Sequence, residues 1–521
     1  MAQLLPQYKK AVIDEIVNSI NSGTSNYYAV AANPIAFAGN TPADVVGEKT
    51  SSAITNWTML FGKKLTNTNI LPVVSNATWV QNTVYSMYDD TADLSNSSFY
   101  CIVTAGAGAD YLFYKCIYNN NGALSTNTPP TSTQYATITL PDGYMWRYVA
   151  SVPSATYASF SANSYVPVLP NNSIVANAGF NSGVDVVLVT NGGVAYTQYC
   201  TGNVGTVSNS TYVQIVSNNM SITSNVYGGT AVYIANQPGN TNPQLANVLS
   251  SNTANPNNSW LTLSSQVNTA QITANAIFIV APRVLFDTDG VTEPLAYCTI
   301  NSISQTVNSV VVINTGTYVS RCNASIYTTN SSFGSNSTIR PIVPPPGGHG
   351  SNPVHELFCQ GIGFSFKFAN TDGANVLSNV IYNKIGIMKN PFVMSTNTST
   401  NSYGAGFKTA TPYTSNTFSQ VLVATVSPAT TFTVGNYIWG GTSMANGIVA
   451  FSNSTTLYIA GDKAYISGEN VTANNGQSAN ITITSVGSIY SRELDYLYVQ
   501  NTDNITRSPT QTEAFKFIVK I

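Results

Sequence analysis

The chain has 521 residues, of which 43% are hydrophobic and 11% aromatic. This apolar content excludes a disordered protein, and the length provides for about two to four domains, each with its own core. Charged residues make up only 8% and the formal net charge is −2, against roughly 25% charged residues in an average soluble domain. Because nucleic-acid binding needs clustered Lys and Arg, this composition excludes that class and favours large, permanent protein contacts.

The N-terminal segment predicts one amphipathic helix. Tyr8, Val12, Ile16 and Ile20 recur at four-residue spacing, and the helix should end near Asn21–Gly23. Charged residues interrupt this apolar pattern, so we expect no signal peptide and expect synthesis in the cytoplasm. Since no run of about 18 apolar residues occurs, we also expect no transmembrane helix and no membrane partner.

Most of the remaining chain predicts short β-strands. Runs rich in Val, Ile, Thr and Tyr are bounded by Asn, Gly, Ser or Pro, a pattern typical of strands separated by turns. The expected fold class is therefore all-β dominated and sandwich-like, with few helices. The clearest runs are Phe99–Val103, Tyr111–Tyr118, Val186–Val189, Ile277–Val280, Val310–Ile313 and Phe515–Ile518.

Changes in composition predict boundaries along the chain. Residues 1–178 hold most of the Trp, whereas residues 179–342 are rich in Asn, Ser and Thr, and the Pro- and Gly-rich segment 344–348 marks a boundary. Two similar segments, Phe432–Gly435 and Tyr465–Gly468, follow each other after about thirty residues. They predict a small β-barrel-like module over residues 396–487.

One pattern is typical of an enzyme. The segment Gly441–Ala445 matches the nucleophile motif of subtilisin-like serine proteases, and Asp287 and His349 precede Ser443 in the order that those proteases use. However, Asn446 stands where a proline is usual, and the alternating strand–helix pattern of that fold is missing. A catalytic triad is a geometry and not a set of short motifs, so we expect a turn at Ser443 and no enzyme.

Other candidate sites lack the ligands that their chemistry needs. Asp287 and Asp289 begin like a calcium loop, but the downstream ligands are absent, so we expect a hairpin turn. His349, His355 and Cys359 do not have a zinc-site spacing. The six cysteines contain no CxxC pair and are expected to be buried thiols. We therefore expect no metal and no cofactor.

The most specific stretch of the sequence begins at Tyr111. The segment Tyr111–Cys116 predicts a strand, and after a proline-containing loop Asp142 and Gly143 predict a turn into a second strand. In the second strand every other residue is aromatic, so one face is entirely aromatic. Burying such a face contributes roughly 2–3 kcal/mol per ring. We therefore expect Tyr144, Trp146 and Tyr148 in a core rather than at an interface.

This block resembles the wedge-subunit family of T4-like phage baseplates, the eighth gene product of the tail. That family has a Tyr-x-Cys strand, a proline-containing loop and an Asp-Gly-Tyr-x-Trp-x-Tyr strand in this order, and the C-terminal segment is similar as well. The resemblance covers residues 1–175, 343–395 and 488–521. The signature residues that carry it are Tyr114, Cys116, Asp142, Gly143, Tyr144, Trp146, Tyr148, Ser491, Glu493, Arg507, Gln511 and Glu513.

The resemblance implies a domain organisation. A two-layer β-sandwich core would comprise residues 1–178 with the N-terminal helix, residues 343–395, and residues 488–521 as the C-terminal strand. Residues 179–342 and 396–487 would be two inserted small β domains.

The resemblance also implies a function without chemistry. The chain would be a homodimeric structural subunit of the baseplate wedge of a contractile-tailed bacteriophage. It would join neighbouring wedge proteins in the six-fold baseplate and take part in tail assembly. It would be assembled in the host cytoplasm and located in the virion, and the inserts would extend contacts to tail fibres or peripheral baseplate proteins.

The competing interpretation is a receptor-binding or fibre-type virion protein. Asn- and Thr-rich β segments are common in such proteins. This interpretation predicts long regular repeats and a trimeric coil or β-helix, and the sequence has neither pattern.

Overall fold

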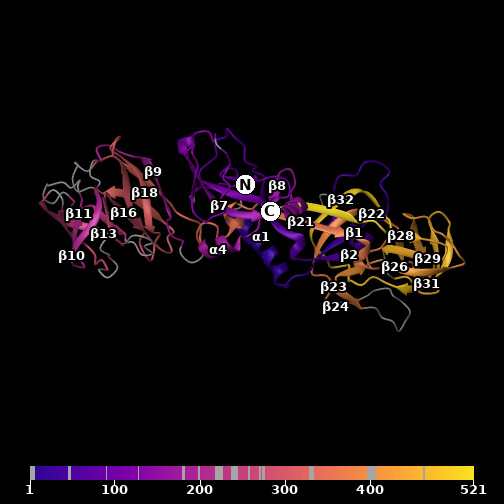
Figure 1. The fold of residues 1–521 in the computed structure, drawn as a ribbon. Helices are drawn as coiled ribbons and strands as arrows, with labels where there is room; N and C mark the ends of the chain where they lie inside the picture. Colours follow the sequence, from indigo (N-terminus) through magenta and orange to yellow (C-terminus); the bar gives the residue numbers. More distant parts are fainter. Residues whose placement is uncertain are drawn as a thin grey trace. The chain divides into compact units, whose positions relative to one another are not determined.

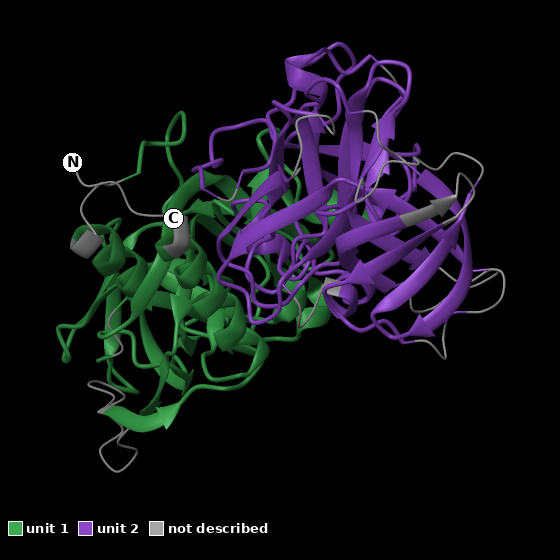
Figure 2. Cartoon of the chain, turned by 90° about the vertical axis from the view of Figure 1, so that its left-hand side faces the viewer, with its two compact units in different colours: residues 1–75, 155–167, 359–521 green, residues 76–154, 168–358 purple. Residues whose placement is uncertain are grey.

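The computed structural model describes residues 6–44, 48–89, 91–126, 128–178, 182–196, 200–217, 227–235, 244–255, 258–268, 272, 276–327, 334–395, 407–461 and 464–521. Antiparallel strands dominate the fold, which confirms the predicted all-β class (Figure 1). The chain divides into two compact units: residues 1–75, 155–167 and 359–521 form unit 1, and residues 76–154 and 168–358 form unit 2 (Figure 2). No helix within the described ranges has the length and apolarity that a membrane crossing needs.

Unit 1 is built around two sheets, with strand orders β25-β2-β1-β22-β32 and β33-β21-β3-β8. The central strand β1 is buried along its whole length, which explains its uninterrupted Tyr, Ala and Val sequence. The elements outside the barrel described below are α1 (Pro6–Asn21), β1 (Tyr27–Ala32), α2 (Glu48–Thr58), β2 (Met59–Leu65), η1 (Asn67–Asn69), β3 (Ile70–Ser75), α3 (Ser154–Phe160), β8 (Tyr165–Pro167), β21 (Gly361–Phe368), η5 (Asn370–Asp372), β22 (Val380–Lys389), β23 (Phe392–Ser395), β24 (Phe407–Pro412), β25 (Thr417–Ser419), β32 (Asp495–Arg507) and β33 (Glu513–Lys520).

Aromatic side chains join the two sheets of unit 1. The ring of Phe61 on β2 lies 5.1 Å from that of Phe368 on β21, edge to face. Tyr382 on β22, in the same sheet as Phe61, packs at 6.4 Å from Phe515 on β33. These contacts between layers confirm the predicted two-layer sandwich. The expected N-terminal helix is α1, which contacts β3 and β21 and has Ile13 and Ile16 buried.

Unit 1 also contains a small closed barrel with strand order β26-β29-β28-β27-β30-β31. In β31 alternate residues point into the apolar interior, while the outward positions are Ser, Asn and Thr. At the neck, the side chain of Gln420 donates to the carbonyl of Ile489 at 2.9 Å and accepts from its N–H at 3.2 Å. The barrel strands are β26 (Leu422–Ser427), β27 (Tyr437–Gly440), β28 (Asn446–Ser452), β29 (Thr456–Gly461), β30 (Asn470–Ala473) and β31 (Ser478–Ser485).

Unit 2 contains a four-stranded sheet β4-β5-β7-β6, a second sheet β18-β17-β16-β19, the pair β20-β9, and a closed barrel β10-β11-β14-β13-β12-β15 with its own apolar core. Its elements are β4 (Tyr100–Thr104), β5 (Tyr111–Asn119), η2 (Asn120–Gly122), β6 (Ile138–Thr139), β7 (Tyr144–Val152), α4 (Asn172–Ala178), β9 (Val186–Asn191), β10 (Cys200–Asn209), β11 (Tyr212–Val216), β12 (Ala231–Ala235), β13 (Gln244–Asn255), β14 (Asn258–Leu263), β15 (Ile277–Ala281), β16 (Arg283–Thr288), β17 (Leu295–Asn301), β18 (Thr306–Asn314), β19 (Cys322–Tyr327), β20 (Thr338–Ile342) and α5 (Pro353–Glu356).

The two units divide the chain differently from the expected domains. The two barrels fall inside the ranges 179–342 and 396–487, whereas the range 1–178, expected to be one part of the core, is shared between both units. The physical reason is strand pairing: the strands of the aromatic block pair with one another in the sheet β4-β5-β7-β6 and not with the strands of the sandwich. Residues 396–406 lie outside the described residues.

Candidate functional site

One face of the sheet β4-β5-β7-β6 carries the aromatic part of the signature. Tyr114 lies opposite Tyr148 across β5 and β7, and Cys116 lies opposite Trp146. The rings of Tyr144 and Trp146 are stacked, with centroids 5.7 Å apart. These five side chains are buried in one hydrophobic cluster, so the prediction that the aromatic residues belong to a core is confirmed.

The turn before β7 depends on Asp142 and Gly143. The carboxylate of Asp142 accepts from the backbone N–H of Tyr144 at 3.2 Å and from that of Thr126 at 3.1 Å. Gly143 has φ of 83°, and a Cβ at this position would lie 2.7 Å from the side chain of Asn120. Glycine is therefore required here for both conformation and space.

The opposite face of this sheet holds buried charge. Lys115 on β5 donates from Nζ to Oε2 of Glu356 on α5 at 2.5 Å, and both side chains are completely buried. The ammonium also lies 2.7 Å from Nδ1 of His349 and 4.1 Å from the centre of the Tyr88 ring. The other oxygen of Glu356 accepts from the backbone N–H of Gly350 at 2.5 Å.

A second ion pair lies next to the first. Arg147 on β7 stands directly opposite Lys115 and pairs with Oδ2 of Asp185 at 2.7 Å. It also donates to the carbonyl of Tyr135 at 3.0 Å and to the hydroxyl of Thr137 at 2.9 Å. Two like charges in opposed positions would destabilise a sheet, so each cation needs its carboxylate.

His349 is neutral in this network. Because Lys115 donates to Nδ1, the ring proton is on Nε2, which faces Oδ1 of Asp185 across 3.7 Å. Burial holds the pKa of His349 well below its ordinary value, and the charges of Lys115 and Arg147 act in the same direction. Burial also lowers the pKa of Lys115, against the opposing effect of Glu356. We call Lys115, Arg147, Asp185, His349 and Glu356 the buried charge network.

The arrangement ties β5 and β7 to the segment before β9 and to the residues that lead into and form α5. The sequence analysis did not predict the buried charge network. The available signal was the presence of Lys115 and Arg147 inside two strongly apolar strands of a chain with only 8% charged residues. Its chemistry is that of a structural tie, because the Lys115–Glu356 pair is completely buried, the Asp185 side chain of the second pair is only 17% exposed, and the donors point at partners from the same chain.

The C-terminal part of the signature lies in unit 1. Arg507, at the end of β32, forms a buried ion pair with Glu513, at the start of β33, and donates to the carbonyl of Phe368 at 3.1 Å. Gln511 accepts from the backbone N–H of Ser508 at 3.3 Å in the connecting turn. These three signature residues therefore fix how β32 passes into β33.

Two signature residues have surface positions. Glu493 pairs with Lys408 at 2.7 Å, and both side chains are exposed. Ser491 lies partly exposed in the turn before β32.

The residues of the protease pattern have other partners. The hydroxyl of Ser443 donates to Oε1 of Glu469 at 2.7 Å, in the turn between β27 and β28. Asp287 is exposed and pairs with Arg321 at 3.0 Å. His349 belongs to the buried charge network. The expected turn at Ser443 is present, and Glu469 explains it: its carboxylate also accepts from the backbone N–H groups of residues 442, 443 and 466.

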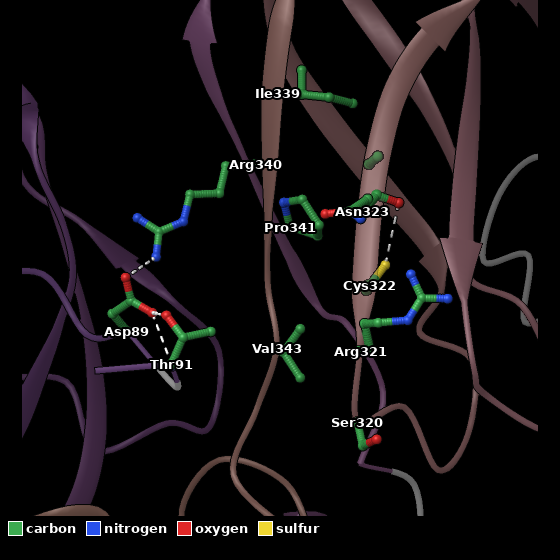
Figure 3. Close-up of a pocket in the computed structure, with 11 residues that line it drawn as sticks. Asp89, Thr91, Ser320, Arg321, Cys322, Asn323, Ile339, Arg340, Pro341 and Val343 are labelled. Carbon is green, nitrogen blue, oxygen red and sulfur yellow. Dashed lines mark hydrogen bonds and ion pairs between the residues drawn. The ribbon is translucent and has the colours of Figure 1, made fainter. Parts of the chain in front are cut away.

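A pocket of about 390 Å³ lies in unit 2 between the segment around Asp89 and strands β19 and β20 (Figure 3). Arg340 points across it to Asp89, with the ion pair at 2.7 Å, and Thr91 also donates to Asp89. Burial acts to raise the pKa of Asp89, but the hydrogen bonds from Thr91 and the charge of Arg340 hold it below its ordinary value. Since Arg321 pairs with Asp287, both guanidinium groups of the pocket are neutralised within the chain.

Metal ligands do not converge among the described residues, where no group of three His, Cys, Asp or Glu side chains is placed to hold an ion. The six cysteines are buried free thiols. Burial raises the pKa of Cys298 and of Cys359 to about 12, so neither is a thiolate at neutral pH. Comparison of the chain with protein-family models and with curated proteins gives no match.

Proposed function

We propose that this protein is a structural subunit of the baseplate wedge of a contractile-tailed bacteriophage. The observation that carries the proposal is the ordered signature. Its aromatic members stand side by side on β5 and β7, and its C-terminal members Arg507 and Glu513 join the last two strands. Signature residues in interiors and turns fit a family whose shared feature is a scaffold rather than a reaction.

The distribution of charge supports the same function. Among the described residues, seven of the few charged ones are buried, namely Lys115, Arg147, Glu356, Lys384, Glu469, Arg507 and Glu513. The remaining surface is rich in Asn, Ser and Thr, which can be covered by a neighbouring protein without the cost of removing charges from water.

The proposal includes a homodimer and contacts with neighbouring wedge proteins. Light scattering on a size-exclusion column should give about twice the chain mass of 55.3 kDa. A trimer would favour the fibre-type alternative instead.

The decisive experiment locates the chain in the particle. Gold-labelled antibodies against the full chain are applied to the contractile-tailed particles produced from the same genome, with serum absorbed on the purified chain as the control. Label at the end of the tail distal to the head is expected. Label along fibres only, or particles that lack the chain, would contradict the proposal.

A further inference from the structure

Part of the small barrel of unit 1 has an exposed surface. Strands β28 and β29 contact β22, β2 and α2. Strands β27, β30 and β31 instead alternate between buried and exposed residues, which is the pattern of a solvated outer surface. We call six neighbouring exposed residues of these three strands the outer face: Tyr437, Trp439, Asn470, Thr472, Ser478 and Asn480.

The strand register places these side chains in rows. Trp439 on β27 is opposite Thr472 on β30, and Thr472 is opposite Ser478 on β31. In the neighbouring row Asn470 is opposite Asn480. The outer face is therefore one continuous surface with a ring at one border and hydroxyl and amide groups beside it.

Hydrogen bonds orient the polar part of the outer face. Oδ1 of Asn470 accepts from Ser478 at 2.7 Å and from Thr472 at 3.4 Å, while its amide nitrogen donates to Asn480 at 3.2 Å. Groups held in this way lose little conformational freedom when they bind a ligand.

The aromatic part is exposed although apolar rings are normally covered. Trp439 is 42% exposed and Tyr437 is 40% exposed. The ring of Tyr437 is fixed by stacking on Trp57 of α2, with centroids 6.3 Å apart and an interplanar angle of 27°. Trp and Tyr rings present a flat apolar face together with a polar group, which suits a ligand that is itself apolar on one side and polar at its edge.

The scarcity of charged side chains in the barrel limits the chemical class of ligand that the outer face can bind. Residues 422–485 contain three charged residues, and Asp462 and Lys463 lie outside the described residues. The third, Glu469, is 5% exposed and is bonded to Ser443 and to backbone N–H groups. The described outer face thus offers an anionic polymer no cation, and a charged peptide no counter-ion.

We propose that the outer face binds a neutral polysaccharide. The apolar C–H face of a pyranose ring would stack on Trp439, and the sugar hydroxyls would exchange hydrogen bonds with Thr472, Ser478 and Asn470. In the OB-fold, another small β-barrel, an exposed strand face together with neighbouring loops binds oligosaccharides. The inference is independent of the proposed function, because a wedge subunit and a fibre protein could each carry such a surface.

The test uses the full chain on an array of neutral gluco-, manno-, galacto- and N-acetylglucosamine oligosaccharides beside sialylated and sulfated ones. Binding to at least one neutral class is expected. Trp439→Ala should weaken the binding of that class about tenfold, as expected for one lost ring contact. Tyr327→Ala is the matched control, because Tyr327 is an exposed aromatic residue (41%) on β19 of unit 2, and it should leave binding unchanged.

A second variant distinguishes a loss of binding from unfolding of the barrel. Thr472→Val keeps the branched shape of the side chain and removes only the hydroxyl, so it should weaken binding about threefold, by the loss of one hydrogen bond. Circular dichroism melting curves should coincide for all variants. Four results would each overturn the proposal. The chain could bind no neutral class, bind acidic glycans only, or selectively bind another protein chain. Trp439→Ala could also bind the glycan with the same affinity as wild type.

Discussion

The sheet β4-β5-β7-β6 and the small barrel use charge in opposite ways. The sheet encloses two cations and two carboxylates, and Lys115 meets Glu356 across 241 positions of sequence. The barrel is formed within residues 422–485, and its core is apolar with one carboxylate, Glu469, at the rim. A locally formed barrel needs only alternating apolar residues, whereas segments separated by a long insert need a contact that few wrong partners could satisfy. We infer that the buried ion pairs contribute such specificity in this sheet.

Loss of one partner in the buried charge network should have the largest effect. Lys115→Met leaves the carboxylate of Glu356 buried without a cation, which should cost about 3–5 kcal/mol of local stability. Since a chain of several units does not unfold in one step, hydrogen–deuterium exchange of peptides from β5 and β7 is the suitable measurement.

Lys408→Met is the matched control for this prediction. Lys408 also pairs with a carboxylate, but its side chain is 39% exposed, so the same change should cost less than about 1 kcal/mol. Similar losses of local stability in the two variants would show that burial does not determine how much each ion pair contributes. Adding Glu356→Gln to Lys115→Met should restore part of the loss.

A smaller effect is expected in the barrel. Glu469→Gln leaves fewer acceptors for the backbone N–H groups of residues 442, 443 and 466, which should cost about 2–3 kcal/mol. Ser443→Ala removes one hydroxyl donor only and should cost about 1 kcal/mol. Exchange of peptides from β27 and β28 measures both, and an equal loss in the two variants would contradict the assigned role of the backbone groups.

The smallest effect depends on pH. Folded His349 is neutral because its pKa is held well below the ordinary value, whereas the unfolded imidazole binds a proton below pH about 6.5. The unfolded state then binds more protons, so stability falls with falling pH, by up to about 1.4 kcal/mol per pH unit. His349→Gln keeps an acceptor for Lys115 and does not titrate.

The comparison of His349→Gln with wild type isolates this one group, since Lys115, Arg147 and Asp185 are the charges that face it in both proteins. Exchange of β5 and β7 peptides at pH 7.5 and pH 5.5 should differ between the two proteins only at the lower pH. Parallel pH dependence would show that the imidazole titrates equally in the folded and unfolded chain.

Local patterns in the sequence predict much of the fold. Each of the six predicted strand runs overlaps a strand, and α1 covers the predicted helix. The aromatic face of β7 follows from alternation alone, because period two assigns Tyr144, Trp146 and Tyr148 to one side. The residues of the small barrel follow from strand signals and turn glycines in the same way.

The partners of the buried charges could not be predicted. Alternation places Lys115 and Arg147 on the face opposite the aromatic residues, and a charged face is normally solvated. That face is covered only because the segments that contain Glu356 and Asp185, which lie later in the sequence, pack against it. The pocket at Asp89 likewise depends on residues far apart in the sequence, since Arg340 lies on a distant strand. Pairings of this kind leave no local pattern.

The double hydrogen bond between Gln420 and Ile489 has an evolutionary consequence. It holds together the two points where the chain leaves the sandwich sheet and returns to it, and Gly487 leaves no space for a Cβ beside the Gln420 amide. Closing a chain over ends that are already adjacent costs little entropy, and that cost grows slowly with the length enclosed. The barrel of residues 422–485 is thus a module that recombination could replace by another, with the sandwich that carries it unchanged.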